Sequence, residues 1–179
     1  HGNFIMRNYK PFMLLQIIIL ICFLPVCCSS TLACTSVCLT EQGYIVFGNN
    51  LDWFIDDALL VINKRNVRKR GAWGDHPPEW VSKYGSITTN LQGSAVPKRG
   101  MNEVGLVIGE MWLGSTIYPD PDARPWVNIT QWIQYQLDTC ATVEEVLATD
   151  KVLRIGKEVY KSHFFVCDAK GTCAVVEWQ

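Results

Sequence analysis

The most hydrophobic part of the chain lies close to its N-terminus. Residues 12–24 are apolar with one exception, and Pro25 ends the run. Basic residues precede this run and small residues follow it, an order that is typical of a secretory signal peptide. A membrane anchor would need about 20 apolar residues, more than this run provides. We therefore predict a leader over residues 1–33, in which the signal peptide covers 6–33 and is cleaved after Ala33.

Short β-type runs open the rest of the chain. Residues 34–39 and 44–47 are separated by a segment that ends in Gly43, which predicts a β-hairpin. If Thr40 and Gly43 flank its turn, Cys34 lies across from Asn49. Three further β-type runs are predicted to be strands: residues 58–62, 84–93 and 104–113.

Two helices and a second hairpin are predicted to follow. Behind a proline-rich segment, apolar residues recur every three or four positions and predict a core-facing helix: Trp126, Ile129, Ile133 and Leu137. Residues 142–145 (Thr-Val-Glu-Glu) form a capping box that opens a second helix through Leu147. Residues 164–167 and 172–178 flank a turn, as in a hairpin. Strands, then helices, then strands predict an α+β fold.

Composition agrees with one globular domain after the leader. Of 179 residues, 49% are hydrophobic and 18% are charged, which excludes a disordered chain. Lys and Arg number 16 against 17 Asp and Glu, so the formal net charge of −1 gives no sign of nucleic-acid binding. Five of the seven residues in 64–70 are basic, and we expect this segment to be a solvated edge.

Eight cysteines are present, and five of them follow the leader: Cys34, Cys38, Cys140, Cys167 and Cys173. An oxidising compartment would let disulfides persist, and an odd number leaves one thiol free, paired outside the chain or chemically active. No metal site is predicted, because His76 and His163 are far apart in the sequence and lack ligand spacing. No cofactor is predicted either.

Cleavage after Ala33 would make Cys34 the first residue, with a thiol and an α-amine on the same residue. Such an amine, with an ordinary pKa of about 7.7 to 8.0, can take the proton of a thiol, whose pKa is ordinarily about 8.5. One residue then supplies nucleophile and base. A disulfide cysteine and a lipidated cysteine are the alternatives, although Thr31 stands where lipid attachment prefers a leucine-like residue.

Asp52 is the candidate acidic partner of this cysteine. It lies about three residues beyond Asn49, or on the order of 10 Å along a strand. A bend at residues 49–50 would bring its carboxylate to the Cys34 ammonium, where it would hold the amine. A cap or turn role for Asp52 is the structural alternative.

Five segments resemble the choloylglycine hydrolase and penicillin V acylase family of linear-amide hydrolases. They follow that family's order: residues 34–39 (Cys-Thr-Ser-Val-Cys-Leu), 46–53 (Val-Phe-Gly-Asn-Asn-Leu-Asp-Trp), 100–106 (Gly-Met-Asn-Glu-Val-Gly-Leu), 142–146 (Thr-Val-Glu-Glu-Val) and 163–177, which begins His-Phe-Phe-Val-Cys-Asp-Ala-Lys-Gly. The resemblance spans residues 34–178 and implies one domain over 34–179. It also implies an αββα sandwich of the N-terminal nucleophile hydrolase type, of which this chain holds the first half.

The resemblance assigns roles to particular residues. Cys34 matches the nucleophile, and Asp52 matches the acidic partner in an Arg-Asn-x-Asp segment. The arginine of that segment is Asn49 here, and the oxyanion asparagine of the family falls on or near Trp112. Backbone N–H groups of Trp112 and Leu113 are candidates for holding the oxyanion. These departures weaken the expectation that the substrate is a bile salt or penicillin V.

The implied activity is hydrolysis of a linear, non-peptide amide in a small N-acyl compound, through a thioester on Cys34. The predicted signal peptide places this activity outside the cytoplasm. The substrate is the one expected partner; neither nucleic acid nor a stable membrane span is expected. An acyltransferase of the same fold is one alternative, and a papain-like enzyme using His163 is another. The third is a secreted, non-catalytic module in which Cys34 pairs with Cys38 or Cys140.

Two covalent features are also predicted. Cys167 and Cys173 flank the turn of the last hairpin and should face each other closely enough for a disulfide. Asn128 begins the sequon Asn-Ile-Thr and is a candidate for N-glycosylation.

Overall fold

A computed structural model of the protein describes residues 34–53, 57–74, 76–91, 97–156 and 160–179. The predicted signal peptide lies outside these residues. Within them, no helix has the length and apolar character needed to cross a membrane.

The first two strands form the predicted hairpin. β1 (Thr35–Glu41) and β2 (Tyr44–Asn50) pair antiparallel around a two-residue turn. Both turn residues have positive φ, 50° at Gln42 and 83° at Gly43, as a tight hairpin turn of this hand requires.

The register of this hairpin differs from the prediction by two positions. Because the turn is centred on Gln42 and Gly43, Asn49 pairs with Ser36 and not with Cys34. A shift of two keeps every side chain on its expected face, since successive side chains alternate between faces. Cys34 therefore precedes the first paired residue of β1, at the open end of the hairpin.

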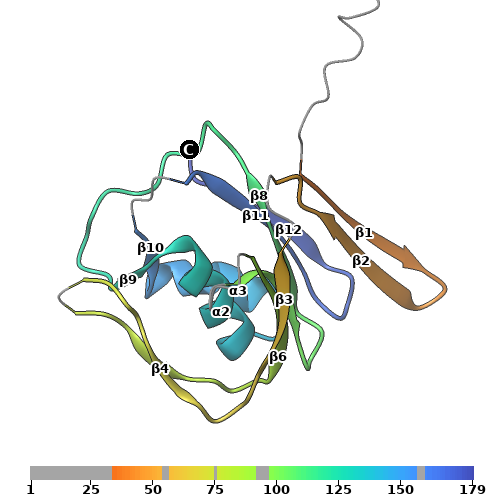
Figure 1. Cartoon of the computed structure of the whole chain (residues 1–179), viewed down its shortest axis with the longest axis horizontal. Coiled ribbons are helices and arrows are strands. Elements are labelled where there is room, and N and C mark those ends of the chain that lie inside the picture. The colour runs from red at the N-terminus through yellow and green to blue at the C-terminus, as the bar shows by residue number, and fades with distance from the viewer. Residues whose placement is uncertain (1–33, 54–56, 75, 92–96, 157–159) are drawn as a thin grey trace, which may run out of the picture. The chain divides into compact units, whose positions relative to one another are not determined.

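Six antiparallel strands form the main sheet, in the order β12-β11-β8-β7-β6-β3 (Figure 1). Their bounds are β3 Ala58–Asn63, β6 Ser86–Leu91, β7 Pro97–Asn102, β8 Val107–Trp112, β11 Ser162–Cys167 and β12 Cys173–Val176. The predicted strands at 58–62 and 84–93, as far as the latter is described, and the last hairpin are confirmed in this sheet.

The strand predicted over 104–113 begins later than expected. Gly105 has φ of 88°, and the N–H of Leu106 donates to the side chain of Asn102, so residues 103–106 turn the chain before β8. This turn connects β7 to β8 as a hairpin. β7 itself is missed by the hydrophobic pattern, because it contains Lys98, Arg99 and Gly100.

Two helices cover one face of the sheet: α2 (Ile129–Thr139) and α3 (Val143–Ala148), followed by the short 3-10 turn η2 (Thr149–Lys151). The predicted stripe of α2 is buried against sheet residues, forming a core that includes Ile129, Ile133, Leu137, Leu106, Ile108, Phe164 and Val166. Trp126 is the exception: the side chain of Asn128 caps α2, so Trp126 lies before the helix, in a strand.

The predicted capping box at the start of α3 is confirmed in outline. The hydroxyl of Thr142 accepts the N–H of Glu145, while the Glu145 carboxylate accepts the N–H of Ala141, one residue earlier than the motif predicts. The first of these bonds satisfies a backbone donor that a helix start leaves open.

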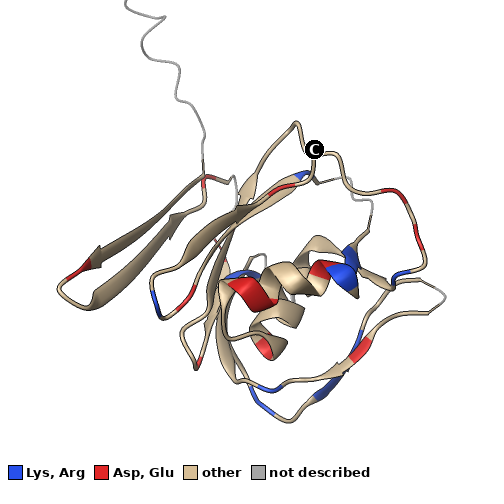
Figure 2. Cartoon of the chain, turned by 180° about the vertical axis from the view of Figure 1, so that it is seen from behind, with Lys and Arg blue, Asp and Glu red and all other residues tan. Residues whose placement is uncertain are grey.

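Two short strand pairs complete the fold: β4 (Arg68–Arg70) with β5 (Glu79–Val81), and β9 (Trp126–Val127) parallel to β10 (Arg154–Ile155). The basic segment 64–70 runs into β4 and contributes some of the blue ribbon in Figure 2. Arg68 is exposed and pairs with Glu79, as a solvated edge predicts. Lys69 instead reaches the fully buried Asp138 at 2.9 Å.

The β1–β2 hairpin packs on the face of the sheet opposite the helices (Figure 1). Phe47 stacks on Phe165 with ring centroids 5.6 Å apart. A Cβ added at Gly171 would stand 2.9 Å from the side chain of Thr40, and one added at Gly109 would stand 2.8 Å from that of Asn49. The order of layers is therefore helices, sheet, hairpin.

Candidate active site at the open end of the hairpin

Cys34 lies at the entry to β1, with its thiol free and half-buried. The next residue, Thr35, pairs with Asn50 at the end of β2. The start of β1 and the end of β2 therefore lie side by side next to Cys34, and the segment that follows β2 begins there.

Asn49 holds this end of the hairpin together. Its Nδ2 donates to the hydroxyl of Ser36 at 2.7 Å and reaches the carbonyl of Thr35 at 3.5 Å. Its amide also lies directly on the backbone of Gly109 in β8. The sequence singled out Asn49 as a departure from a family pattern, and in the structure it joins β1, β2 and β8.

Asp52 follows two residues after β2, on the same end of the hairpin as Cys34. Its Oδ1 accepts a hydrogen bond from Asn50 Nδ2 at 2.7 Å, which orients the carboxylate. Asp52 makes a further interaction besides this one. β2 ends at Asn50, where the sequence analysis placed the bend that an acidic partner requires, and the pairing of the Asp52 carboxylate with the amine stays a prediction.

Arg99 is a site residue that the sequence reasoning missed. Its Nη1 donates to the main-chain carbonyl of Asn49 at 2.9 Å, across 50 positions of sequence. Burial lowers the pKa of the Arg99 guanidinium, while the negative charges of Cys34 and Glu110 act to raise it. Arg99 carries no sequence motif, so only the pairing of β7 with β8 reveals it.

The oxyanion candidates at the end of β8 have different surroundings. The side chain of Trp112 is exposed, and the role of its backbone N–H stays a prediction. The N–H of Leu113 donates to the carbonyl of Lys161 at 3.0 Å. This donor is already used, and Leu113 is therefore a poor candidate for holding an oxyanion.

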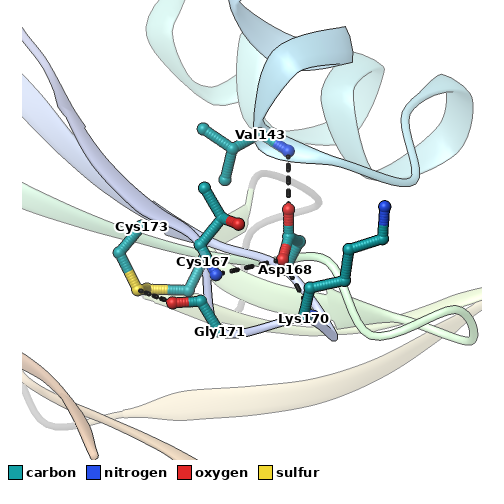
Figure 3. Close-up of a disulfide and its surroundings, with 7 residues drawn as sticks. Val143, Cys167, Asp168, Lys170, Gly171 and Cys173 are labelled. Carbon is teal, nitrogen blue, oxygen red and sulfur yellow. Dashed lines mark hydrogen bonds between the residues drawn. A yellow bond between two sulfur atoms is a disulfide. The ribbon is translucent and has the colours of Figure 1, made fainter.

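Cys167 and Cys173 lie directly opposite each other on β11 and β12, and their sulfur atoms are bonded (Figure 3). The adjacent Asp168 is buried, and its carboxylate accepts the N–H groups of Lys170 and Thr172 in the turn and of Val143 at the start of α3. The disulfide hairpin is thus fixed to the helix layer.

The other three cysteines after the leader are free: Cys34, Cys38 and Cys140. Neither disulfide of the binding-module alternative, Cys34 with Cys38 or Cys34 with Cys140, is formed. The sulfur of Cys38 lies within 4.8 Å of both sulfurs of the Cys167–Cys173 bridge. Because those two are bonded to each other, this cluster offers a single thiol to a metal ion.

Asn128 is the N-cap of α2. Its Oδ1 accepts the N–H of Gln131 at 2.8 Å and the hydroxyl of Thr130, the third residue of the sequon, at 2.9 Å. Its glycosylation stays a prediction.

A free cysteine that opens a hairpin, laid on a sheet whose other face carries helices, fits the first half of an N-terminal nucleophile hydrolase sandwich. Comparison with known families agrees: residues 34–179 match the linear amide C-N hydrolases of the choloylglycine hydrolase family. The chain belongs to this family. The α+β prediction and the predicted fold type are thereby confirmed, and the papain-like and binding-module alternatives are not favoured.

Individual relatives give the same result. The chain is 30% identical over 168 residues to a penicillin V acylase of Pectobacterium atrosepticum, covering 83% of this chain and 45% of that protein. A solved penicillin V acylase from Agrobacterium tumefaciens superposes with a TM-score of 0.71 at 32% identity, over 82% of this chain and 46% of the other.

A more distant solved structure shares the fold. A mutant of the conjugated bile acid hydrolase from Clostridium perfringens has a TM-score of 0.66 at 21% identity, over 82% of this chain and 48% of that one. The chain therefore spans about half the length of the relatives it matches.

Proposed function

We propose that Cys34 is the N-terminal nucleophile of a secreted amidase that hydrolyses a linear amide bond in a small N-acyl compound. The observation that carries this proposal is that the family match begins at Cys34 itself, whose thiol is free at the entry to β1. The predicted signal peptide ends one residue earlier, which supports both the free amine and secretion.

The reaction would proceed by acyl transfer to sulfur. The Cys34 α-amine takes the thiol proton, and the thiolate attacks the amide carbonyl of the substrate. The resulting ammonium protonates the leaving amine as the carbon–nitrogen bond breaks, which leaves a thioester on Cys34. Water, activated by the same amine, then releases the acid. Asp52 would hold the ammonium during both steps.

The substrate class follows from this chemistry: an N-acyl amino acid, an N-acyl amine or a conjugated steroid. Penicillin V is the first probe, because the two relatives at 30% and 32% identity are penicillin V acylases. Asn49 in place of the family's arginine argues for testing a panel of simpler N-acyl amides beside it. An acyltransferase would reveal itself when an added amine, rather than water, captures the acyl group.

The N-terminus of the secreted full-length protein tests the proposal. Edman or mass-spectrometric sequencing is expected to begin Cys-Thr-Ser-Val, and release of a primary amine from the probe amides is expected in the same preparation. A mature chain that starts at another residue, yet hydrolyses the probes, would overturn the assignment, because an extended or acylated amine cannot act as the base.

A further inference from the structure

Arg99 is a half-buried cation on the face of the main sheet that carries the hairpin. It pairs with Gly109 of β8 and with Thr89 of β6, and Asn49 lies on that same glycine. The charged end groups of long side chains usually lie in water, so a guanidinium that is partly buried between the main sheet and the hairpin is unusual.

The neighbouring lysine does not share this position. Lys98 points to the opposite face, where it forms an ion pair of 3.0 Å with the buried Glu110, and Glu110 also accepts a bond from Ser162. Among the described residues, Arg99 has no such carboxylate in an ion pair. Its positive charge is therefore the one that β7 presents to the hairpin.

The guanidinium of Arg99 has donors to spare. Of its five N–H groups, Nη1 uses one on the Asn49 carbonyl, and Nε is buried with no hydrogen-bond partner within the described part of the chain. A buried unsatisfied donor costs free energy, which an anion at that place would recover. The guanidinium is therefore hydrogen-bonded at Nη1 and unsatisfied at the buried Nε.

The residue that Arg99 contacts lies beside Cys34 at the end of the hairpin. Asn49, to which Arg99 is bonded, is itself bonded to Thr35 and Ser36, the two residues that follow Cys34. In agreement, a negative charge on Cys34 acts on the guanidinium in the direction that raises the pKa of Arg99. The hydrogen bond of Arg99 thus brings a cation from β7 to Asn49.

We propose that Arg99 is a positioning residue for the nucleophile: anchored on the main chain of Asn49, its guanidinium faces the Cys34 thiolate and stabilises it for attack. This inference rests on the proposed function, in which Cys34 is the nucleophile. No substrate contact is required of Arg99, since the charge acts on the sulfur before the amide binds.

Selective alkylation of Cys34 in the full-length protein tests this role without turnover. Arg99→Gln is compared with Arg99→Lys and with Arg68→Gln, a control at an exposed arginine. At pH 7, Arg99→Gln is expected to slow alkylation of Cys34 by iodoacetamide about tenfold, as when an opposite charge near an acid is removed. The ratio of iodoacetate to iodoacetamide rates should also fall, because iodoacetate is an anion. Arg99→Lys should restore most of both, and Arg68→Gln should change neither.

Turnover gives the second readout. Arg99→Gln is expected to lower kcat more than it raises KM, because Arg99 stabilises the Cys34 thiolate and does not contact the substrate. Unchanged alkylation and an unchanged ratio in folded Arg99→Gln would overturn the proposal, as would a rise in KM alone. If Arg99→Gln does not fold, Arg99→Lys decides. The proposal requires its ratio of iodoacetate to iodoacetamide rates to stay within about twofold of wild type. A ratio as low as that of the denatured protein would overturn the proposal.

The outcome is separable from failure of the proposed function. Full amidase activity in Cys34→Ser would overturn the assignment of Cys34 as the nucleophile, whatever the result for Arg99. Loss of activity in Cys34→Ser, together with unchanged alkylation and turnover in Arg99→Gln, would overturn only the proposed role of Arg99.

Discussion

The side-chain amide of Asn49 lies on the backbone of Gly109, so close that a Cβ at position 109 would stand 2.8 Å from Asn49 Nδ2. This contact joins the end of β2 to the centre of the main sheet. Asn49 also donates to the hydroxyl of Ser36, and its carbonyl accepts a hydrogen bond from Arg99. We therefore expect the close approach at Gly109 to fix how far the β1–β2 hairpin lies from the main sheet.

Gly109→Ala should therefore displace the hairpin and reduce activity more than stability. Overpacking of this kind costs about 1–3 kcal/mol, whereas a shift of about 1 Å at a reacting group can cost on the order of 10²-fold in rate. Amidase kinetics and chemical unfolding measure the two effects. Gly85→Ala is the matched control, since its nearest contact would be an ordinary 3.4 Å. Equal kinetics in the two variants would show that the contact does not position the site.

Asp138 is expected to be a major stabilising residue of the helix layer. It is fully buried and accepts hydrogen bonds from Lys69 in β4 and Trp80 in β5, which tie this strand pair to α2. A third bond comes from Gln134 within α2. Asp138→Asn leaves the Lys69 ammonium without its counter-charge, which typically costs about 3–5 kcal/mol for a buried pair.

Chemical unfolding of Asp138→Asn measures this loss, with Glu79→Gln as the control. Glu79 pairs with Arg68 at the exposed edge, where a salt bridge contributes about 0–1 kcal/mol. A loss in Asp138→Asn no larger than in Glu79→Gln would contradict the central place of Asp138.

Cys140 should be the slowest thiol of the folded protein. Burial raises the pKa of the Cys140 thiol, with the nearby Thr139 hydroxyl acting in the opposite direction. The raised pKa of the Cys140 thiol contributes to the stability of the folded state, and this contribution is complete below the pKa of the unfolded thiol. It is lost as pH rises toward the folded pKa, because the native state then binds more protons than the unfolded state.

Timed alkylation at pH 8 followed by peptide mapping checks this order. Cys34 and Cys38, both half-buried, should be labelled before Cys140, and denaturant should make the three rates similar. Native labelling of Cys140 as fast as in denaturant would show that the thiol is not enclosed.

Most elements of the fold could be predicted from local patterns. Local patterns predict the apolar stripe in α2, the capping box at Thr142 and the two hairpins, because each depends on residues that are close together in the sequence. β7 could not be found this way. Its Gly100 faces the helix, where an added Cβ would stand 2.8 Å from Leu137, and its charged neighbours hide the alternation that marks a strand.

The site was only partly predictable, for a related reason. Cys34 and Asp52 lie next to one hairpin, and a motif places them there together. Arg99 comes to the same hairpin through the pairing of β7 with β8, which depends on contacts far apart in sequence. The register of β1 and β2 was wrong by two because the turn, set by Gln42 and Gly43, was assigned one residue too early.

The most direct test of the account is the amidase rate of Cys34→Ser in the full-length secreted protein, measured beside Asp52→Asn on penicillin V and a panel of N-acyl amides. Serine nearly preserves the shape of cysteine but is a far weaker nucleophile with this base, so the account predicts loss of activity by orders of magnitude with the fold intact. Asp52→Asn should lose about 10²-fold or more, because the charge that holds the base is gone. Near-wild-type turnover by Cys34→Ser on every amide hydrolysed, with Asp52→Asn also silent, would contradict the account and leave the family relationship as one of fold alone.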